Sequence, residues 1–152
     1  IGFSQAGWII PLAAEKNSKV NFMVLFSGPV VTAREQLRFQ FFTQGNANFW
    51  ETHSESEMRT YILNAPDKYQ FVDTDPRIAL SKLSIKGLWI FGGKDIQIPT
   101  QLSIENICHL KDGGKSYEYH LFPALGHNTT PSGNSESFDM AVNWIDTRVC
   151  KK

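Results

Sequence analysis

The sequence begins Ile1-Gly2-Phe3-Ser4-Gln5-Ala6-Gly7, and this stretch sets the expectation for the fold of the whole chain. A strict G-x-S-x-G pattern would need glycine where the chain has Ala6, with Gly7 one residue later. Small residues must flank a serine where a strand turns sharply into a helix, because the two backbones crowd together there. Gly2 and Ala6 meet that requirement. The stretch therefore predicts a strand-to-helix turn that presents the Ser4 hydroxyl to solvent.

Ser4 in such a nucleophile elbow is a candidate nucleophile. A serine hydroxyl is a weak nucleophile at neutral pH, and it needs an adjacent base that is oriented by an acid. The backbone amide of Gln5, which follows the serine, is expected to point to where an oxyanion would form. Because a serine between small residues often arises by chance, the hypothesis depends on a base and an acid elsewhere in the chain.

The composition is that of an ordinary globular domain. The 152 residues are 41% hydrophobic and 20% charged, which is enough for one domain with one core. Fifteen basic and fifteen acidic residues cancel, so charge gives no argument for nucleic acid or for an anionic membrane as a partner. No apolar run approaches the length needed to cross a bilayer.

The start of the chain carries an expectation of its own. An elbow serine follows a buried strand of several residues, and at most residues 1–3 of such a strand are present. We therefore expect residues 1–152 to form one partial domain whose N-terminal strands lie in a longer protein. A signal peptide could belong to that portion, so the sequence indicates no compartment. Missing strands would leave an apolar sheet edge uncovered, and we expect self-association through it.

Patterns further along the chain alternate between strands and helices. Runs rich in apolar side chains at residues 20–26, 86–91 and 116–122 have the length of strands. A near-continuous apolar strand that follows a helix is typical of a parallel sheet covered on both faces. The alternation therefore predicts an α/β fold, with parallel strands and helices on both faces.

Three helices are predicted before, between and after these strands. The first covers residues 5–15 and contains Pro11, where we expect a bend or a new start because proline removes a helical hydrogen bond. The second covers residues 99–110, with proline in its first turn. The third covers residues 137–149. Its expected apolar face consists of Phe138, Ala141, Val142, Ile145 and Val149.

Residues 31–73 interrupt this alternation. Helices are predicted at 32–43, with Thr32 as a plausible cap, and at about 54–65, so the segment is expected to be a small helical cap insertion. Aromatic residues are frequent here, and Phe39, Phe42 and Trp50 are candidates for contact with a substrate. The alternative is that these rings only pack the insertion onto the body, since aromatic side chains are ordinary core material.

Three residues that carry chemistry follow predicted strands directly. Ser4 follows the first short strand, Asp95 follows the strand that ends in Gly92-Gly93, and His127 follows the last strand. In open parallel sheets, functional groups collect beyond the carboxyl ends of the strands. We therefore expect the three side chains along one edge of the sheet, in the chain order serine, acid, histidine.

At these stretches the sequence resembles the α/β-hydrolase family, particularly its prolyl-oligopeptidase-like and dienelactone-hydrolase-like esterases and peptidases. The resemblance spans nearly the whole chain, and it rests on residues 2–7, on residues 75–76 with 88–95, and on residues 122–127. It implies that Ser4 is the nucleophile, His127 the general base, Asp95 the acid that orients the histidine, and the Gln5 amide one oxyanion donor. The family's second oxyanion donor comes from a loop ahead of the elbow, which the sequence does not contain.

Other residues compete weakly for these roles. Asp73 and Asp75 are alternative acids, but neither follows a predicted strand. His53, His109 and His120 lack the spacing of a metal site, and Cys108 and Cys150 lack metal or redox spacing, so neither a metal nor a cofactor is expected. The acceptor pattern at residues 128–130 would place a glycan beside the proposed base, and we interpret it as coincidence.

The sequence thus favours acyl transfer to water, on a small ester, thioester or peptide-like substrate, through an acyl-enzyme intermediate. The alternative is a non-catalytic fragment or interaction module that keeps the motifs without a complete oxyanion hole. Because losing one oxyanion donor costs about two to three orders of magnitude in turnover, we expect the isolated chain to be a poor hydrolase and a longer parent to be a competent one.

Overall fold

A four-stranded parallel sheet forms the centre of the protein. In the computed structural model, which describes residues 1–130 and 135–148, the strand order is β1-β2-β3-β4. The strands are β1 (Gly2–Phe3), β2 (Phe22–Phe26), β3 (Lys86–Gly92) and β4 (Tyr117–Phe122). Each strand pairs in parallel with the next along the chain. The three predicted strands are thus confirmed, with their ends shifted by no more than two residues.

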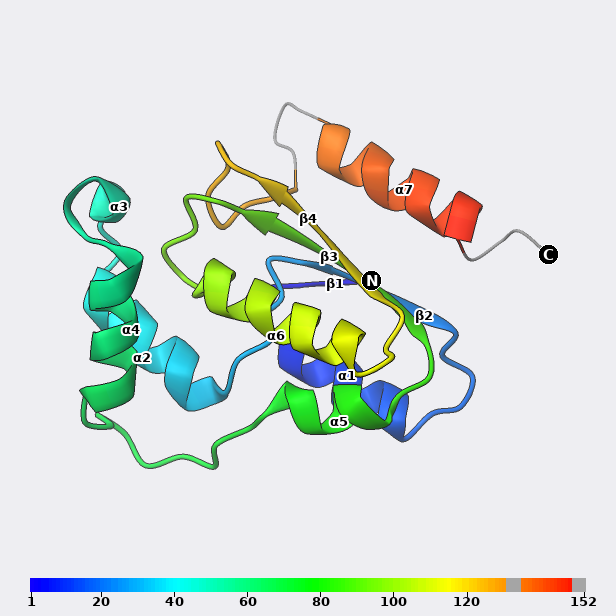
Figure 1. Cartoon of the computed structure of the whole chain (residues 1–152), viewed down its shortest axis with the longest axis horizontal. Coiled ribbons are helices and arrows are strands. Elements are labelled where there is room, and N and C mark those ends of the chain that lie inside the picture. The colour runs from blue at the N-terminus through cyan, green and yellow to red at the C-terminus, as the bar shows by residue number, and fades with distance from the viewer. Residues whose placement is uncertain (131–134, 149–152) are drawn as a thin grey trace.

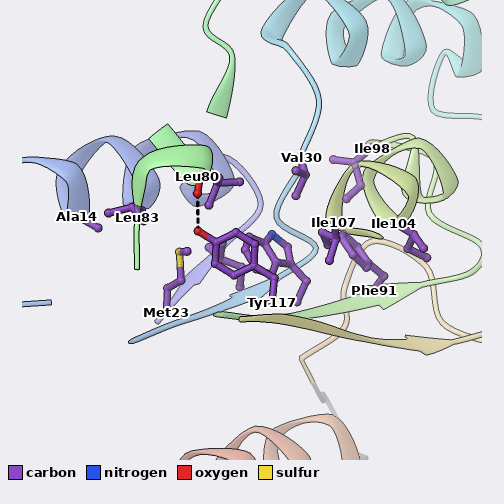
Figure 2. Close-up of a cluster of buried hydrophobic side chains, with 12 residues drawn as sticks. Ala14, Met23, Val30, Leu80, Leu83, Phe91, Ile98, Ile104, Ile107 and Tyr117 are labelled. Atoms are coloured by element: carbon purple, nitrogen blue, oxygen red, sulfur yellow. Dashed lines mark hydrogen bonds between the residues drawn. The ribbon is translucent and has the colours of Figure 1, made fainter. Parts of the chain in front are cut away.

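One face of the sheet is covered by α1 (Ala6–Glu15), α5 (Pro76–Lys82) and α6 (Thr100–Asp112), as Figure 1 shows. Side chains from β2, β3 and β4 pack with these helices in a buried cluster, drawn in Figure 2. The Tyr117 hydroxyl in this cluster donates a hydrogen bond of 2.8 Å to the Leu80 carbonyl. Burial raises the pKa of Tyr117 to about 12.

The other face is covered by α7 (Glu136–Arg148), so helices lie on both faces as predicted (Figure 1). Successive strand residues point to opposite faces, and Val24, Phe26, Leu88 and Ile90 therefore meet α7 in a second cluster.

The predicted apolar face of α7 is partly wrong. The buried positions are Ser137, Ala141 and Trp144, whereas Phe138 and Val142 remain 45% and 43% exposed. The buried positions follow a spacing of four and then three residues, which keeps them on one side of a helix. Polar Ser137 replaces Phe138 on that side because its hydroxyl bonds to the Thr129 carbonyl. Val149 lies outside the described residues.

Helix α1 continues through Pro11 as a single element, so the helix does not begin anew there. Pro11 is buried, and its ring occupies a place in the packed face with Gly7 and Ala14. The missing hydrogen bond at one position is evidently outweighed by this packing, as tertiary contacts often outweigh local propensity. Among the described residues, no helix has both the length and the apolar character needed to cross a bilayer.

Residues 31–73, here called the helical segment, lie beyond the carboxyl ends of the strands in Figure 1. The segment contains α2 (Ala33–Thr43), the short α3 (Phe49–Thr52), which the sequence did not predict, and α4 (Glu55–Asn64). Thr32 caps α2 and Ser54 caps α4, and each serves in a reciprocal capping box with the glutamate three residues on. A third buried cluster, made of Phe39, Phe49, Met58 and Ile62, holds the helices together.

Candidate active site

Ser4 occupies a strained turn between β1 and α1. Its φ angle is 50°, in the left-handed region that side chains with a Cβ rarely adopt. Its amide donates to the Phe26 carbonyl at 2.9 Å, which fixes the turn against the end of β2. A Cβ on Gly2 would lie 2.4 Å from the Ala6 Cβ, so strand and helix do approach too closely for larger residues. Gly2 and Ala6 are therefore small for the steric reason that the sequence predicted.

The backbone contacts of Gly7 explain why the second glycine of the elbow lies one residue after the strict motif position. A Cβ at Gly7 would lie 2.5 Å from the backbone nitrogen of Pro29 and 2.7 Å from the carbonyl carbon of Gly28. The first turn of α1 thus rests directly on the loop that follows β2. At the strict motif position, Ala6 can keep its methyl group because the close backbone contact falls on the next residue.

Asp95 lies in the loop after β3, and its carboxylate is completely shielded from solvent. One oxygen, Oδ1, accepts hydrogen bonds from the backbone amides of Gln97 at 2.7 Å and Ile98 at 3.0 Å. The other oxygen, Oδ2, lies 2.8 Å from Nδ1 of His127. A buried carboxylate needs such donors on both oxygens, and here they leave it a single orientation.

His127 lies in the loop after β4 and contacts both other candidates. Its Nδ1 faces Asp95, and its Nε2 lies 3.0 Å from the Ser4 hydroxyl oxygen. The His127 side chain keeps 18% of its surface exposed, whereas the Asp95 carboxylate behind it is fully buried. Residues 4, 95 and 127 are therefore brought together from three separate loops, in the arrangement that allows an imidazole to take a proton from a serine.

Two glycines let the loops after β3 and β4 meet. A Cβ on Gly92 would lie 2.0 Å from the Gly126 carbonyl oxygen, and one on Gly93 would lie 2.9 Å from the backbone of Pro123. The Lys94 amide donates to the Leu125 carbonyl at 2.8 Å, which joins the loops further. The sequence marked Gly92-Gly93 only as the end of a strand. Their second role, which is to admit the histidine loop, is visible only in the tertiary structure.

Ser27 is a residue of this region that the sequence reasoning missed. It follows β2 directly, is 2% exposed and has a φ angle of 47°. Its hydroxyl lies 2.6 Å from the His127 carbonyl oxygen. The strand-end rule that singled out Ser4, Asp95 and His127 applies equally to Ser27, and this was the available signal.

Gln5 is the N-cap residue of α1, and its side chain makes no capping hydrogen bond. The first amides of a helix have no partner within the helix and carry partial positive charge. An amide next to Ser4 at this helix start suits an oxyanion donor, and that role for Gln5 stays a prediction.

The alternative acids are occupied elsewhere. Asp73 accepts hydrogen bonds from the Arg34 amide and guanidinium at 2.9 and 2.7 Å. Asp75 caps α5 and pairs with the Arg77 side chain at 2.8 Å. Within residues 1–130 and 135–148, no group of three or more histidine, cysteine or acidic side chains is placed to hold a metal ion. Cys108 is free and partly buried, and Cys150 lies outside the described residues.

The candidate substrate-binding rings take three different positions. Phe39 is 0% exposed inside the cluster of the helical segment, so it cannot contact a ligand in this structure and that prediction is corrected. Phe42 lines a cavity of about 460 Å³ between α2 and α4. Trp50 donates from Nε1 to the Asp95 carbonyl at 2.8 Å. Substrate contact by Phe42 and Trp50 stays a prediction.

Trp50 also lines a second cavity, of about 390 Å³, together with Glu55 and Gly93. Burial raises the pKa of the Glu55 carboxyl, while the guanidinium of Arg59, 3.0 Å away, acts in the opposite direction. The ion pair with Arg59 thus partly neutralises the carboxyl group that lines this cavity.

Comparison with known proteins supports the architecture. The sequence matches no protein-family model. It is 26% identical over 104 residues to the acylamino-acid-releasing enzyme of Arabidopsis thaliana, a match that covers 68% of this chain and 14% of that protein. The chain therefore spans only a small part of this relative.

Solved structures give the same picture. The acylaminoacyl peptidase of Pyrococcus horikoshii superposes with a TM-score of 0.61 at 15% identity, over 96% of this chain and 23% of that one. An esterase from Exiguobacterium antarcticum superposes with a TM-score of 0.59 at 16% identity, over 96% of this chain and 65% of that one. The chain thus has part of an α/β-hydrolase fold, as the sequence resemblance implied.

Proposed function

We propose that this chain carries the nucleophile, base and acid of a serine hydrolase, which cleaves an ester, thioester or amide bond through an acyl-enzyme. One observation carries the proposal: His127 lies within hydrogen-bond distance of both the Ser4 hydroxyl, at 3.0 Å, and the buried Asp95 carboxylate, at 2.8 Å. The α/β-hydrolase fold supports it, as do relatives that are named as a peptidase and an esterase.

The first half of the reaction transfers the acyl group to the protein. His127 Nε2 takes the Ser4 proton while Oγ attacks the substrate carbonyl carbon, whose oxygen becomes an oxyanion. The Gln5 amide is the donor proposed for that oxyanion. The imidazolium then gives its proton to the leaving alcohol, thiol or amine as the bond to the carbonyl carbon breaks.

The second half returns the protein to its starting state. His127 takes a proton from water, the resulting hydroxide adds to the acyl carbon, and the proton goes back to Ser4 Oγ as the acid product leaves. The Asp95 carboxylate accepts a hydrogen bond from Nδ1–H of His127 without taking the proton, so that Nε2 is the basic nitrogen that faces the serine.

A fluorophosphonate probe tests the proposal without knowledge of the substrate, because only an activated serine reacts quickly with it. We expect labelling at Ser4 and hydrolysis of p-nitrophenyl acetate, both lost in Ser4→Ala and in His127→Ala. Ser18→Ala is the matched control, since Ser18 is exposed and precedes β2 at the opposite edge of the sheet. Unlabelled protein that is correctly folded would instead favour the non-catalytic interaction module.

A further inference from the structure

Ser27 links the nucleophile's turn to the loop that carries the proposed base. The Phe26 carbonyl, one residue earlier, accepts the Ser4 amide hydrogen bond at 2.9 Å. The Ser27 amide donates to the Ile90 carbonyl of β3 at 2.8 Å, and its hydroxyl donates to the His127 carbonyl at 2.6 Å. Two consecutive residues at the end of β2 therefore contact the elbow, the strand that leads to Asp95, and the histidine loop.

The hydrogen-bond directions around Ser27 are determined by its single proton. That proton goes to the His127 carbonyl, which accepts and cannot donate. The Thr129 hydroxyl, 3.0 Å from the Ser27 oxygen, must therefore be the donor in their contact. Ser137 of α7 in turn donates to the Thr129 carbonyl. The three hydroxyl residues are 2%, 2% and 3% exposed, so they form a buried chain from α7 to the histidine loop.

The His127 carbonyl accepts twice, from the Ser27 hydroxyl and from the Thr129 amide at 3.0 Å. Two acceptances use both lone pairs of a carbonyl oxygen and so fix the peptide plane after His127. With the ring itself held by Asp95, the remaining freedom of the imidazole lies in the backbone of its loop. The Ser27 hydroxyl bonds to that backbone directly.

We propose that Ser27 is a positioning residue, whose buried hydroxyl holds the His127 loop at hydrogen-bond distance from Ser4. The inference rests on the proposed serine-hydrolase function. Ser27 touches no reacting atom, and it acts through the backbone of the base. Its φ angle of 47° lies in the left-handed region, which glycine would adopt more easily. The chain thus has serine where the backbone alone would favour glycine, as expected if the hydroxyl has a role. Glycine, however, has no side-chain donor for the His127 carbonyl, whereas serine has one.

The φ angle makes a decisive variant available. Ser27→Gly removes the hydroxyl while it relieves the backbone, so relief of the left-handed φ angle offsets part of the cost of the lost buried hydrogen bonds. We expect kcat on p-nitrophenyl acetate to fall by about ten- to a hundredfold, the range expected for a displaced catalytic group, with KM unchanged. Fluorophosphonate labelling of Ser4 should slow by the same factor. Ser27→Ala should slow both reactions equally.

Ser103→Ala is the matched control. Ser103 is a fully buried serine of α6 whose hydroxyl accepts a hydrogen bond from the Val30 amide. It therefore supports the loop after β2, which also contains Ser27, and makes no hydrogen bond to the histidine loop. We expect its kcat to stay within about twofold of the native value. Equal slowing by Ser103→Ala and Ser27→Gly would overturn the proposal, because general loosening of the loop after β2 would then explain the lower kcat. Native kcat in Ser27→Gly would also overturn it.

Hydrogen exchange at the Thr129 amide gives a readout that does not need activity. This amide shares the His127 carbonyl with Ser27, so its exchange should speed up by about tenfold or more in Ser27→Gly and stay native in Ser103→Ala. If the native protein proves unreactive, the proposed function fails. Exchange at the native rate at Thr129 in Ser27→Gly would separately refute the proposal that Ser27 holds the His127 loop. Faster exchange in an unreactive protein would show that Ser27 holds the loop and that the role in catalysis is wrong.

Discussion

The carboxyl edge of the sheet and the helical segment are built from different contacts. At the sheet edge, polar atoms are buried and individually paired: the Asp95 carboxylate, completely shielded from solvent, has donors on both oxygens, and the 2% exposed Ser27 hydroxyl has partners on both sides. In the helical segment, by contrast, rings pack against rings, as in the stacked pair of Phe42 and Tyr61 with centroids 4.4 Å apart. Its ion pairs, such as Arg34 with Asp67, lie on the surface.

This difference has a consequence for function. Buried hydrogen bonds are directional and costly to leave unmade, so the sheet edge holds its side chains in one geometry. Ring contacts are worth about 0.5–1.5 kcal/mol beyond the area they bury and tolerate several orientations. We therefore expect chemistry to depend on the sheet edge, and shape and stability to depend on the helical segment.

The two regions meet at the backbone of the Asp95 loop. Trp50 donates from its indole to the Asp95 carbonyl, and Thr43 donates from its hydroxyl to the Ile96 carbonyl, both at 2.8 Å. These contacts are the place where a change in the helical segment can reach the candidate site.

Asp95→Asn is expected to have the largest effect. The amide can still accept from Gln97 and Ile98, but its NH₂ group would face His127 Nδ1 and favour the wrong tautomer. Turnover should fall by about 10⁴-fold while folding is kept. Asp75→Asn is the control, because asparagine caps a helix as well as aspartate. Steady-state kinetics on p-nitrophenyl acetate decides, and a loss below tenfold would argue against Asp95 as the orienting acid.

Phe39→Ala tests the other side of the comparison. Phe39 is fully buried, and its ring packs against those of Phe49 and Trp50, with centroids 6.1 and 6.0 Å away. Its truncation should lower the free energy of unfolding by about 3–5 kcal/mol, measured by urea denaturation. Phe41→Ala, at a half-buried ring, should cost less.

Labelling of Ser4 gives the second readout for Phe39→Ala. Below the unfolding transition, the fluorophosphonate rate should change far less than in Asp95→Asn. If the two variants lose comparable reactivity, the regions are not separable and the distinction drawn between them is wrong.

Tyr117 shows that buried polar groups also matter beneath the sheet. Burial raises its pKa from the ordinary 10.0 to about 12, so the folded state holds the phenol proton more tightly than the unfolded state. The resulting stability is fully present below pH 10 and is lost as pH rises from 10 to about 12, by roughly 2–3 kcal/mol in total. Native protein should therefore lose more stability than Tyr117→Phe over this range.

Urea denaturation at pH 7, 10 and 12 measures this difference. Tyr119→Phe, at an exposed ring of the same strand, controls for the general effect of alkali on the sheet. Parallel losses in native protein and in Tyr117→Phe would mean that the phenol titrates alike in the folded and unfolded chains.

Trp50→Phe is expected to have the smallest effect, and it sharpens the boundary between the regions. It removes one hydrogen bond to the Asp95 carbonyl and keeps an aromatic ring in place. A net contribution of about 0.5–1.5 kcal/mol for such a bond corresponds to a loss in kcat of at most about tenfold. Trp8→Phe, which removes a similar indole bond to the Val31 carbonyl, is the control. A rise in KM alone would instead indicate that Trp50 contacts substrate.

The sequence by itself determined the architecture and the residues that the structure brings together at the sheet edge. Strand and helix periodicity is local information, and it predicted the parallel strands, the capped helix at Thr32 and the helices on both faces. The strand-end rule then placed Ser4, Asp95 and His127 at one edge, because parallel strands deliver their following loops to the same side.

The tertiary structure decided what depends on contacts between distant segments. Whether Phe39 faces a ligand or the core, and whether Ser137 or Phe138 of α7 is buried, follows from which neighbours pack there. Ser27 reaches His127 across 100 positions of sequence, and Gly92 is needed only because Gly126 crosses it. Such contacts leave no periodic trace in a single sequence, since the physical requirement arises from a partner that the local pattern does not contain.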